Sequence, residues 1–175
     1  MSLTDWLARI LAPDRLVERI SDLEPEALKA AGIRGLILDL DNTLCEWQSE
    51  AVPQDILQWV AKMKTAGIRM CIASNTHDRR RLRRMAAGLD LPSVSGAPKP
   101  RRLCFARALA LLDVSAAEAA IVGDQLFTDV LGGKRSGIRT ILVRPIHRRE
   151  FVGTRISRLF EGFLIAHFRR RGRLP

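Results

Sequence analysis

The sequence predicts an α/β protein built on an open, parallel β-sheet. Short apolar segments alternate with helical patterns along the chain, and two of these segments end directly in acidic residues. The chain has 175 residues, which fits one compact domain. Apolar residues make up 47% of it and charged residues 27%, so the side chains for a sizeable core are present. Strands that alternate with single helices usually pair in parallel, through right-handed crossovers.

The first 32 residues have the pattern of an amphipathic, helical segment. Apolar residues recur at helical spacing on both sides of Pro13, which interrupts the pattern. The positions before the proline are Leu3, Trp6, Leu7, Ile10 and Leu11, and those after it are Leu16, Val17, Ile20 and Leu23. We therefore expect two short helices over 1–32. Such helices can pack on the sheet or lie on a membrane, because an apolar stripe looks the same in both cases.

The regular alternation occupies residues 33–145 and predicts the core of the protein. The expected strands are 34–40, 68–74, 93–97, 119–123 and 138–143. The expected helices are 53–66, 78–87, 101–112 and 126–136. Gly67 and Gly137 follow two of these helices, where glycine commonly ends a helix. The prediction is a three-layer α/β/α arrangement with a five-stranded parallel sheet and helices at both chain ends.

Residues 146–175 form a basic C-terminal segment outside this alternation. From His147 onward the chain contains eight arginines and only two glutamates, with apolar residues interleaved at near-helical spacing. A basic amphipathic helix of this kind can lie in the interface of an anionic membrane. The alternative is a helix docked on the sheet, followed by an unstructured end.

The charge distribution indicates an anionic partner. The chain has a net charge of +10, but residues 1–50 carry ten acidic and five basic residues, so the remainder is strongly basic. A membrane surface, a nucleic acid and a phosphorylated substrate all fit this balance.

The cellular location predicted from the sequence is cytoplasmic, with peripheral association at the inner membrane face as an option. We find no apolar run of about 18 residues, the length needed to cross a bilayer, and no pattern of a secretion signal. The cysteines are Cys45, Cys71 and Cys104, and no C-x-x-C pair occurs. This excludes an obvious disulfide framework or zinc site.

Polar residues gather where the predicted strands end, which is where parallel sheets bind ligands. They are Asp39, Asp41, Asn42 and Thr43 after the first strand, Ser74 and Asn75 after the second, Lys99 after the third, and Gly123, Asp124 and Asp129 after the fourth. Carboxylates held this close repel one another unless a cation lies among them. Because oxygen ligands favour it, we expect that cation to be Mg²⁺.

This set of residues suits phosphoryl transfer. One carboxylate can attack phosphorus and form an aspartyl-phosphate, while a second protonates the leaving oxygen and later activates water. A metal ion, a lysine and backbone N–H groups can neutralise the charge on the transferring group.

Four motifs in order resemble those of haloacid-dehalogenase-like (HAD) phosphatases. They are LILDLDNTL at 36–44, CIASN at 71–75, Lys99, and IVGDQLFTD at 121–129. The resemblance implies that Asp39 is the nucleophile and Asp41 the general acid and base. It also implies that Ser74, Asn75 and Lys99 bind the substrate phosphate, with Lys99 counted among the catalytic residues.

The same resemblance implies a magnesium site. Its ligands are Asp39, Asp124 and the main-chain carbonyl of Asp41. Asp129 and Gly123 support this site, and Thr43 braces the loop after the first strand.

The sequence is most similar to the YqeG-type subfamily of HAD phosphatases. The strings that carry this similarity are DLDNTLCEW, APKP and GDQLFTDVLGGKRSG, with Lys134 where an asparagine is commoner. The subfamily is related to the phosphatidylglycerophosphate phosphatases of mitochondria and plastids. The resemblance therefore implies a phosphorylated substrate, and among such substrates an anionic phospholipid in phospholipid biosynthesis.

The spacing of the motifs predicts a phosphatase without a cap domain. Only 27 residues separate Asp41 from the second predicted strand, enough for one loop and one helix. An open site can receive a phosphate that a bulky molecule presents.

Other classes of protein remain possible at this stage. A soluble phosphate ester is the alternative substrate, and an RNA- or ribosome-associated binding protein is the alternative class. An EF-hand is disfavoured because Leu44 stands where its loop needs glycine, and a receiver domain because its acids come in another order. Without their neighbours, Ser74 would be read as a helix cap and Lys99 as a solvated loop charge.

Overall fold

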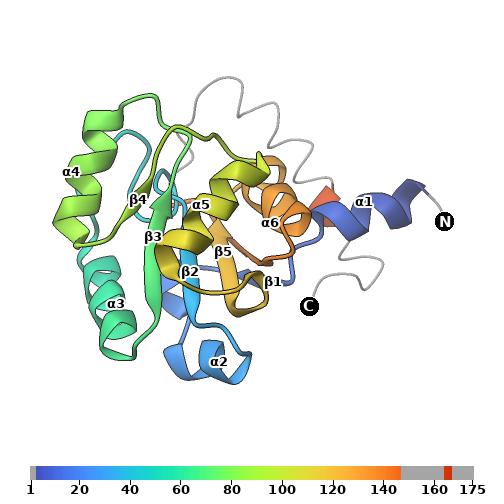
Figure 1. Ribbon diagram of the computed structural model, residues 1–175, viewed down its shortest axis with the longest axis horizontal. Coiled ribbons are helices and arrows are strands. Elements are labelled where there is room, and N and C mark those ends of the chain that lie inside the picture. Colours follow the sequence, from blue (N-terminus) through green and yellow to red (C-terminus); the bar gives the residue numbers. More distant parts are fainter. Residues whose placement is uncertain (1–2, 147–163, 167–175) are drawn as a thin grey trace.

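A computed structural model of the protein describes residues 3–146 and 164–166 (Figure 1). Its centre is a parallel sheet of six strands in the order β1-β6-β5-β2-β3-β4. The strands are β1 (Arg15–Val17), β2 (Gly35–Leu38), β3 (Arg69–Ala73), β4 (Ser93–Val94), β5 (Ala119–Gly123) and β6 (Arg139–Val143). The predicted α/β class is confirmed, and five of the strands lie where the sequence predicts them. The predicted number of strands is wrong by one.

The extra strand is β1, where the sequence pattern predicts a second helix. Leu16 pairs with Leu142 of β6, and β1 forms the edge of the sheet. The apolar residues after Pro13 fit a helix and a strand followed by a turn equally well, and the open edge of β6 decides between them. The rest of this stretch forms a 3₁₀ turn, Ile20–Asp22, and α2 (Pro25–Ala30).

Helices cover both faces of the sheet. On one face, α3 (Gln54–Thr65) and α4 (Arg79–Leu89) pack against residues such as Leu36 and Leu38 of β2. On the other face, α5 (Arg102–Leu112) packs against Ile37 and its neighbours. Because alternate side chains of a strand point to opposite faces, β2 contributes to both cores and is buried throughout.

The predicted helix 126–136 consists of two parts. Residues Leu126–Val130 form a π-helical turn, and α6 (Leu131–Arg135) continues from it. Two glycines let α6 approach its neighbours closely. A Cβ added at Gly132 would lie 2.3 Å from the Phe105 ring, and one at Gly133 would lie 2.5 Å from Ile121.

Helix α1 (Leu3–Leu11) packs on the domain. Ala8 and Leu11 are buried, and their cluster includes Phe127 and Leu131 at the π-helical turn and α6 (Figure 1). Of the two alternatives that the sequence leaves open for this helix, the described residues therefore show the packed one. The segment predicted over 146–175 lies outside the described residues, except for 146 and 164–166.

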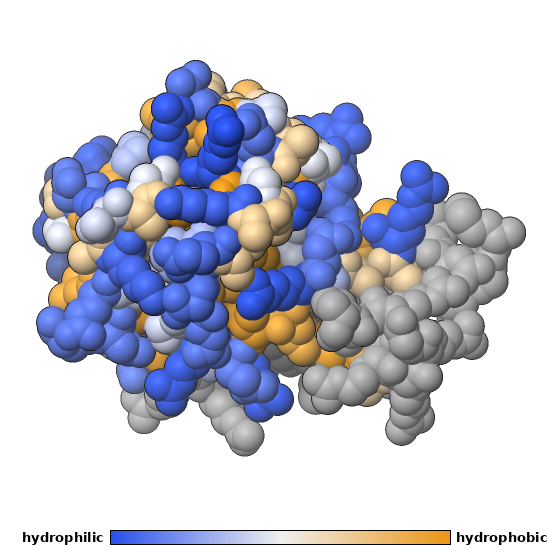
Figure 2. All heavy atoms as spheres, turned by 90° about the horizontal axis from the view of Figure 1, so that it is seen from below, coloured by the Kyte–Doolittle hydropathy of each residue, from blue (hydrophilic) through white to orange (hydrophobic). Residues whose placement is uncertain are grey.

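Polar residues cover most of the described surface that faces the viewer in Figure 2. In the described part of the chain, the large apolar side chains that are exposed are Trp47, Leu57, Leu103, Leu111 and Ile146. Among the described residues, no helix has both the length and the apolar character needed to cross a bilayer.

Asp14 connects the N-terminal segment to the sheet, and we expect its replacement to destabilise the protein. Its carboxylate accepts hydrogen bonds from the Thr140 N–H (2.8 Å) and hydroxyl (2.9 Å), and it forms an ion pair with Lys134. Asp14→Ala should lower the free energy of unfolding by about 1–2 kcal/mol, because the Thr140 groups lose their acceptor.

This effect should depend on pH. Burial raises the pKa of Asp14, but the bonds from Lys134 and Thr140 outweigh it and leave this pKa below its ordinary value of 3.8. A lowered pKa adds stability above the unfolded value, and this stability is lost as the pH falls through the folded one. Urea unfolding at pH 7 and pH 3 should therefore show a smaller difference between Asp14→Ala and the original protein at pH 3. An equal difference at both values would contradict the ionic role.

Candidate active site

The first two acids of the site follow neighbouring strands. Asp39 comes directly after β2 and Asp124 directly after β5, and these strands pair with Leu38 opposite Val122. The Asp39 N–H donates to the Val122 carbonyl (2.9 Å), which extends the pairing to the loop. From β2 the chain runs outward to β3 and β4 and then returns to β5 on the other side of β2. The acids therefore lie at a switch point of a parallel sheet, where ligands of such folds bind.

Lys99 joins two of the acids. Its Nζ lies 2.6 Å from Asp39 Oδ1 and 2.7 Å from Asp129 Oδ1, and the side chains of all three residues are buried. The lysine lies in the loop between β4 and α5, about 60 residues from Asp39 in sequence. The structure thus brings Lys99 to the carboxylates, as the sequence predicts.

Asn75 positions the loop that carries Lys99. Its side-chain oxygen accepts from the Lys99 N–H (2.7 Å), and its side-chain nitrogen donates to the Lys99 carbonyl (2.9 Å). Both groups of the amide are therefore used on the protein backbone, whereas the sequence predicts that Asn75 binds the substrate phosphate. That contact stays a prediction, and the second N–H of the Asn75 amide is the group that could make it.

Asp129 approaches the site from the π-helical turn. Its Oδ2 accepts a hydrogen bond from the Gln125 N–H (3.1 Å), which fixes the carboxylate against the backbone. Gly123 makes this approach possible, because a Cβ at that position would lie 2.2 Å from the same Oδ2. The two residues that the sequence predicts as supports thus contact each other directly.

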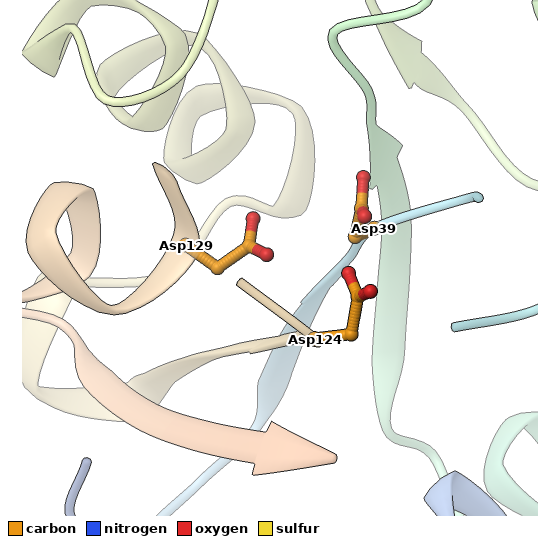
Figure 3. A group of neighbouring side chains, drawn as sticks. All are labelled: Asp39, Asp124 and Asp129. Atoms are coloured by element: carbon orange, nitrogen blue, oxygen red, sulfur yellow. The ribbon is translucent and has the colours of Figure 1, made fainter. Parts of the chain in front are cut away.

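Three buried carboxylates gather at this point (Figure 3). One oxygen atom of each of Asp39, Asp124 and Asp129 lies within 4.8 Å of those of the other two. The side chains point toward one another from three different segments of the chain. Oxygen-only donors at this spacing suit a hard divalent cation, so the residues fit a metal ion.

Burial changes how the acid at the centre ionises. The pKa of Asp39 is raised from 3.8 to about 6 by burial, opposed by the nearby Lys99 ammonium and reinforced by the charge of Asp129. Burial lowers the pKa of Lys99, but the two carboxylates outweigh this and raise it above its ordinary value. Lys99 therefore stays charged, and above about pH 6 Asp39 is an anion with an ammonium beside it.

Asp41 lies apart from the cluster of three carboxylates. Its side chain forms an ion pair with Arg81 of α4 (2.9 Å), and its Oδ1 also accepts from the Gln48 N–H (2.9 Å). The sequence pattern predicts no individual role for Arg81 in the site. A signal was present, because Arg81 stands on the apolar stripe of α4 with Leu82 and Met85.

The other predicted residues occupy distinct places. Ser74 lies in the loop after β3, and its hydroxyl accepts from the Thr76 N–H (3.2 Å). Asn42 adopts a left-handed backbone conformation (φ 62°), which asparagine tolerates better than most residues. The Thr43 hydroxyl is buried with no hydrogen-bond partner among the described residues, so the predicted bracing is not made by this hydroxyl.

A cavity of about 770 Å³ opens over these residues. It is lined by Asp39, Asp41, Asn42, Trp47, Gln48, Glu50, Ser74, Asn75, Thr76, His77, Asp78, Arg81, Lys99, Gln125 and Thr128. Within residues 35–94, loops with one helix each connect β2 to β3 and β3 to β4, so no cap domain is inserted there. Five of the predicted site residues, Asp39, Asp41, Ser74, Asn75 and Lys99, line this one open pocket.

Comparison with known proteins defines the class. Residues 96–148 match the family model described as HAD-hydrolase-like, and residues 7–86 match the one described as mitochondrial PGP phosphatase. Together with the fold and the site, these matches define the protein as a HAD-like phosphoric monoester hydrolase acting on a phosphorylated substrate. A Bacillus subtilis protein named "Probable phosphatase YqeG" is 36% identical over 168 residues, covering 96% of this chain and 97% of that protein. The chain belongs to the YqeG family.

More distant relatives carry more specific names. A phosphatidylglycerophosphate phosphatase 1 of Arabidopsis thaliana is 25% identical and one of Chlamydomonas reinhardtii 29%, each over more than nine tenths of this chain. The chain spans only 51% and 62% of their respective lengths.

Solved structures agree on the fold. A predicted HAD-like hydrolase from Porphyromonas gingivalis matches with a TM-score of 0.54 and 13% identity, over 74% of this chain and 98% of its own. The cobalt-bound deoxy-D-mannose-octulosonate 8-phosphate phosphatase of Haemophilus influenzae matches with a TM-score of 0.52 and 20% identity, over 66% and 70%.

Proposed function

We propose that the protein hydrolyses phosphatidylglycerophosphate to phosphatidylglycerol with Mg²⁺, through an aspartyl-phosphate on Asp39. One observation carries the chemistry: the buried Asp39 carboxylate lies 2.6 Å from Lys99 Nζ and beside two further carboxylates, at an open pocket. A carboxylate ionised above about pH 6 can attack a phosphorus atom, and the lysine can neutralise the phosphoryl oxygens.

The reaction then has two steps. In the first, an Asp39 oxygen forms a bond to phosphorus while the bond to the leaving oxygen breaks, and Asp41 gives that oxygen a proton. In the second, water attacks phosphorus, Asp41 takes its proton, and the bond to Asp39 breaks to release phosphate. The Ser74 hydroxyl and the Lys99 ammonium line the pocket and are suited to hold the phosphoryl oxygens.

A magnesium ion is the cofactor that we propose for the carboxylate cluster. Asp39 and Asp124 would hold it, with Asp129 as support and the main-chain carbonyl of Asp41 as a further ligand. When bound, the ion supplies positive charge to the phosphoryl group.

Three observations favour a lipid substrate. Residues 7–86 match the PGP phosphatase family model, and two relatives bear that name. The pocket is open to large molecules, since no cap is inserted within residues 35–94. The chain also carries a net charge of +10. We accordingly propose that residues 33–145 catalyse and that the basic segment 146–175 assists a peripheral association with anionic membrane.

Phosphate release from phosphatidylglycerophosphate in anionic vesicles tests this function. The assay includes Mg²⁺, the Asp39→Asn variant, and glycerol 3-phosphate as a soluble ester. Turnover of the lipid that needs Asp39 and far exceeds that of the ester supports the proposal. Turnover of the soluble ester alone would support the chemistry and overturn the lipid substrate. No turnover of either compound would favour a nucleic-acid-binding role, which the salt dependence of RNA binding would check.

Mg²⁺ should also stabilise the fold by binding the carboxylate cluster. At about 100 times its Kd, an ion that binds only the folded state adds about 2.7 kcal/mol to the free energy of unfolding. We expect Mg²⁺ to raise the melting temperature of the original protein but not that of Asp124→Asn. Asp113→Asn, which changes an exposed acid remote from the cluster, is the control and should respond like the original protein. An equal rise in Asp124→Asn would place the ion elsewhere.

A further inference from the structure

Arg81 is a buried arginine on a helix whose other arginines are exposed. Its neighbours Arg79, Arg80, Arg83 and Arg84 face solvent, whereas Arg81 is only 5% exposed and stands in the buried stripe of α4. A guanidinium is rarely buried without partners, because leaving water costs several kcal/mol. The contacts of Arg81 should therefore explain why it is there.

The guanidinium of Arg81 holds Asp41 by one hydrogen bond and one further ion-pair contact. Nη2 lies 2.9 Å from Asp41 Oδ1, and Nη1 donates to Oδ2 at 3.1 Å. Contacts to both oxygens fix the place and the direction of a carboxylate, and a lysine, with its single nitrogen, cannot reproduce them.

The same guanidinium fastens the loop that follows Asp41. Its Nε and Nη2 donate to the Ser49 carbonyl at 3.1 and 2.6 Å, and Nη2 also contacts Cys45 Sγ at 3.3 Å. Within the loop, the Gln48 N–H donates to Asp41 Oδ1. Arg81 thus joins α4 to three points of a loop some 32–40 residues earlier in the chain, and both Asp41 and Arg81 line the pocket.

We infer that Arg81 is a positioning residue, which aims Asp41 at the leaving oxygen of the substrate. The inference rests on the proposed role of Asp41 as general acid. In this step Asp41 is the carboxylic acid, and the oxygen that carries the proton gives up its contact to Arg81. As the bond between phosphorus and the leaving oxygen breaks, the proton passes from Asp41 to that oxygen, the Asp41 carboxylate again pairs with Arg81, and Arg81 keeps its own protons and charge. A carboxylate held in one direction needs no reorganisation at this moment, whereas a free one samples many rotamers.

A comparison of leaving groups tests this inference. An alkoxide is a poor leaving group and needs the proton, whereas 4-nitrophenolate leaves readily without it. We would measure kcat/KM, which reports the steps up to loss of the leaving group, for an alkyl phosphate and for 4-nitrophenyl phosphate. The alkyl phosphate is phosphatidylglycerophosphate or glycerol 3-phosphate, whichever the original protein turns over faster.

The variants are Arg81→Met, Arg81→Lys and Asp41→Asn, with Arg83→Met as the matched control on the exposed side of the same helix. Arg81→Met should lose about 100-fold on the alkyl phosphate and less than about 3-fold on the aryl one, since general acid catalysis is worth about 10²–10⁴. Arg81→Lys should keep the charge but only part of the alkyl activity. Arg83→Met should match the original protein on both.

Equal losses on both esters would show a merely structural role, and no loss on either would show no role; both overturn the inference. Thermal melting shows whether Arg81→Met folds. If it does not, the kcat/KM values of Arg81→Lys and the original protein on the two esters test the inference instead. Should Asp41→Asn itself treat the two esters alike, the proposed acid role fails and the inference with it. A different result is that Asp41→Asn lowers kcat/KM more for the alkyl phosphate than for the aryl one while Arg81→Lys lowers both equally. In that case Asp41 keeps its proposed role as the acid, and only the positioning role of Arg81 fails.

Discussion

Replacing Asp39 by asparagine should abolish phosphate release without weakening the fold. The asparagine keeps the shape of the side chain but cannot form an acyl-phosphate, and loss of a nucleophile lowers kcat by on the order of 10⁶. Asp55→Asn, which changes an exposed acid in the first turn of α3, is the matched control and should keep full activity. Retained activity above about 1% in Asp39→Asn would mean that another group attacks the phosphorus.

The stability of the same variant provides a separate check, in metal-free buffer with a chelator. The raised pKa of Asp39 means that the folded protein binds more protons than the unfolded chain between pH 3.8 and about 6. The original protein therefore loses stability as the pH rises through this window, and the variant lacks this loss. We expect urea unfolding to show that Asp39→Asn gains stability relative to the original protein from pH 4 to pH 7. A relative loss would show that the ionised Asp39 stabilises the metal-free fold.

Replacing Lys99 by methionine should damage both activity and stability. Removal of one partner from a buried ion pair costs about 3–5 kcal/mol, and here it leaves the Asp39 and Asp129 carboxylates without the ammonium between them. Phosphate release should fall by about 10²–10³, the loss typical of removing a group that stabilises the transferred charge.

Two further variants show whether the stability loss of Lys99→Met comes from the buried carboxylates. Lys62→Met removes a half-exposed lysine that pairs with Glu24, and it should cost less than about 1 kcal/mol. The double variant Lys99→Met with Asp129→Asn should recover part of the stability, because one of the two facing charges is gone. Chemical unfolding of the four proteins measures this recovery. No recovery in the double variant would show that the carboxylates do not repel each other as we infer.

The sequence alone predicted the main part of the site, for a local reason. Asp39, Ser74 and Asp124 each follow an apolar run that reads as a strand, and the carboxyl ends of parallel strands share one edge of the sheet. The order of elements therefore placed these residues together before any contact was known. The prediction of Lys99 as a site residue depended on the residues around it as well, because a lysine in a loop is usually solvated.

Other features depended on contacts that a local pattern does not contain. β1 pairs at the edge of β6, although its apolar residues suit a helix as well as a strand. Asn75 holds the Lys99 backbone from 24 residues away. The predicted bracing by the Thr43 hydroxyl has no counterpart among the described residues.

The amino-acid sequence was sufficient to predict the parallel α/β fold, the edge of the sheet that carries the chemistry and the acids that lie there. These follow from the periodicity of apolar residues and from the position of polar ones relative to strand ends. The contacts between these groups follow from the three-dimensional fold: Lys99 with Asp39 and Asp129, and Arg81 with Asp41. Such pairs join residues 30 to 60 positions apart, and the strand order and the packing of α4 and α5 set the distances between them.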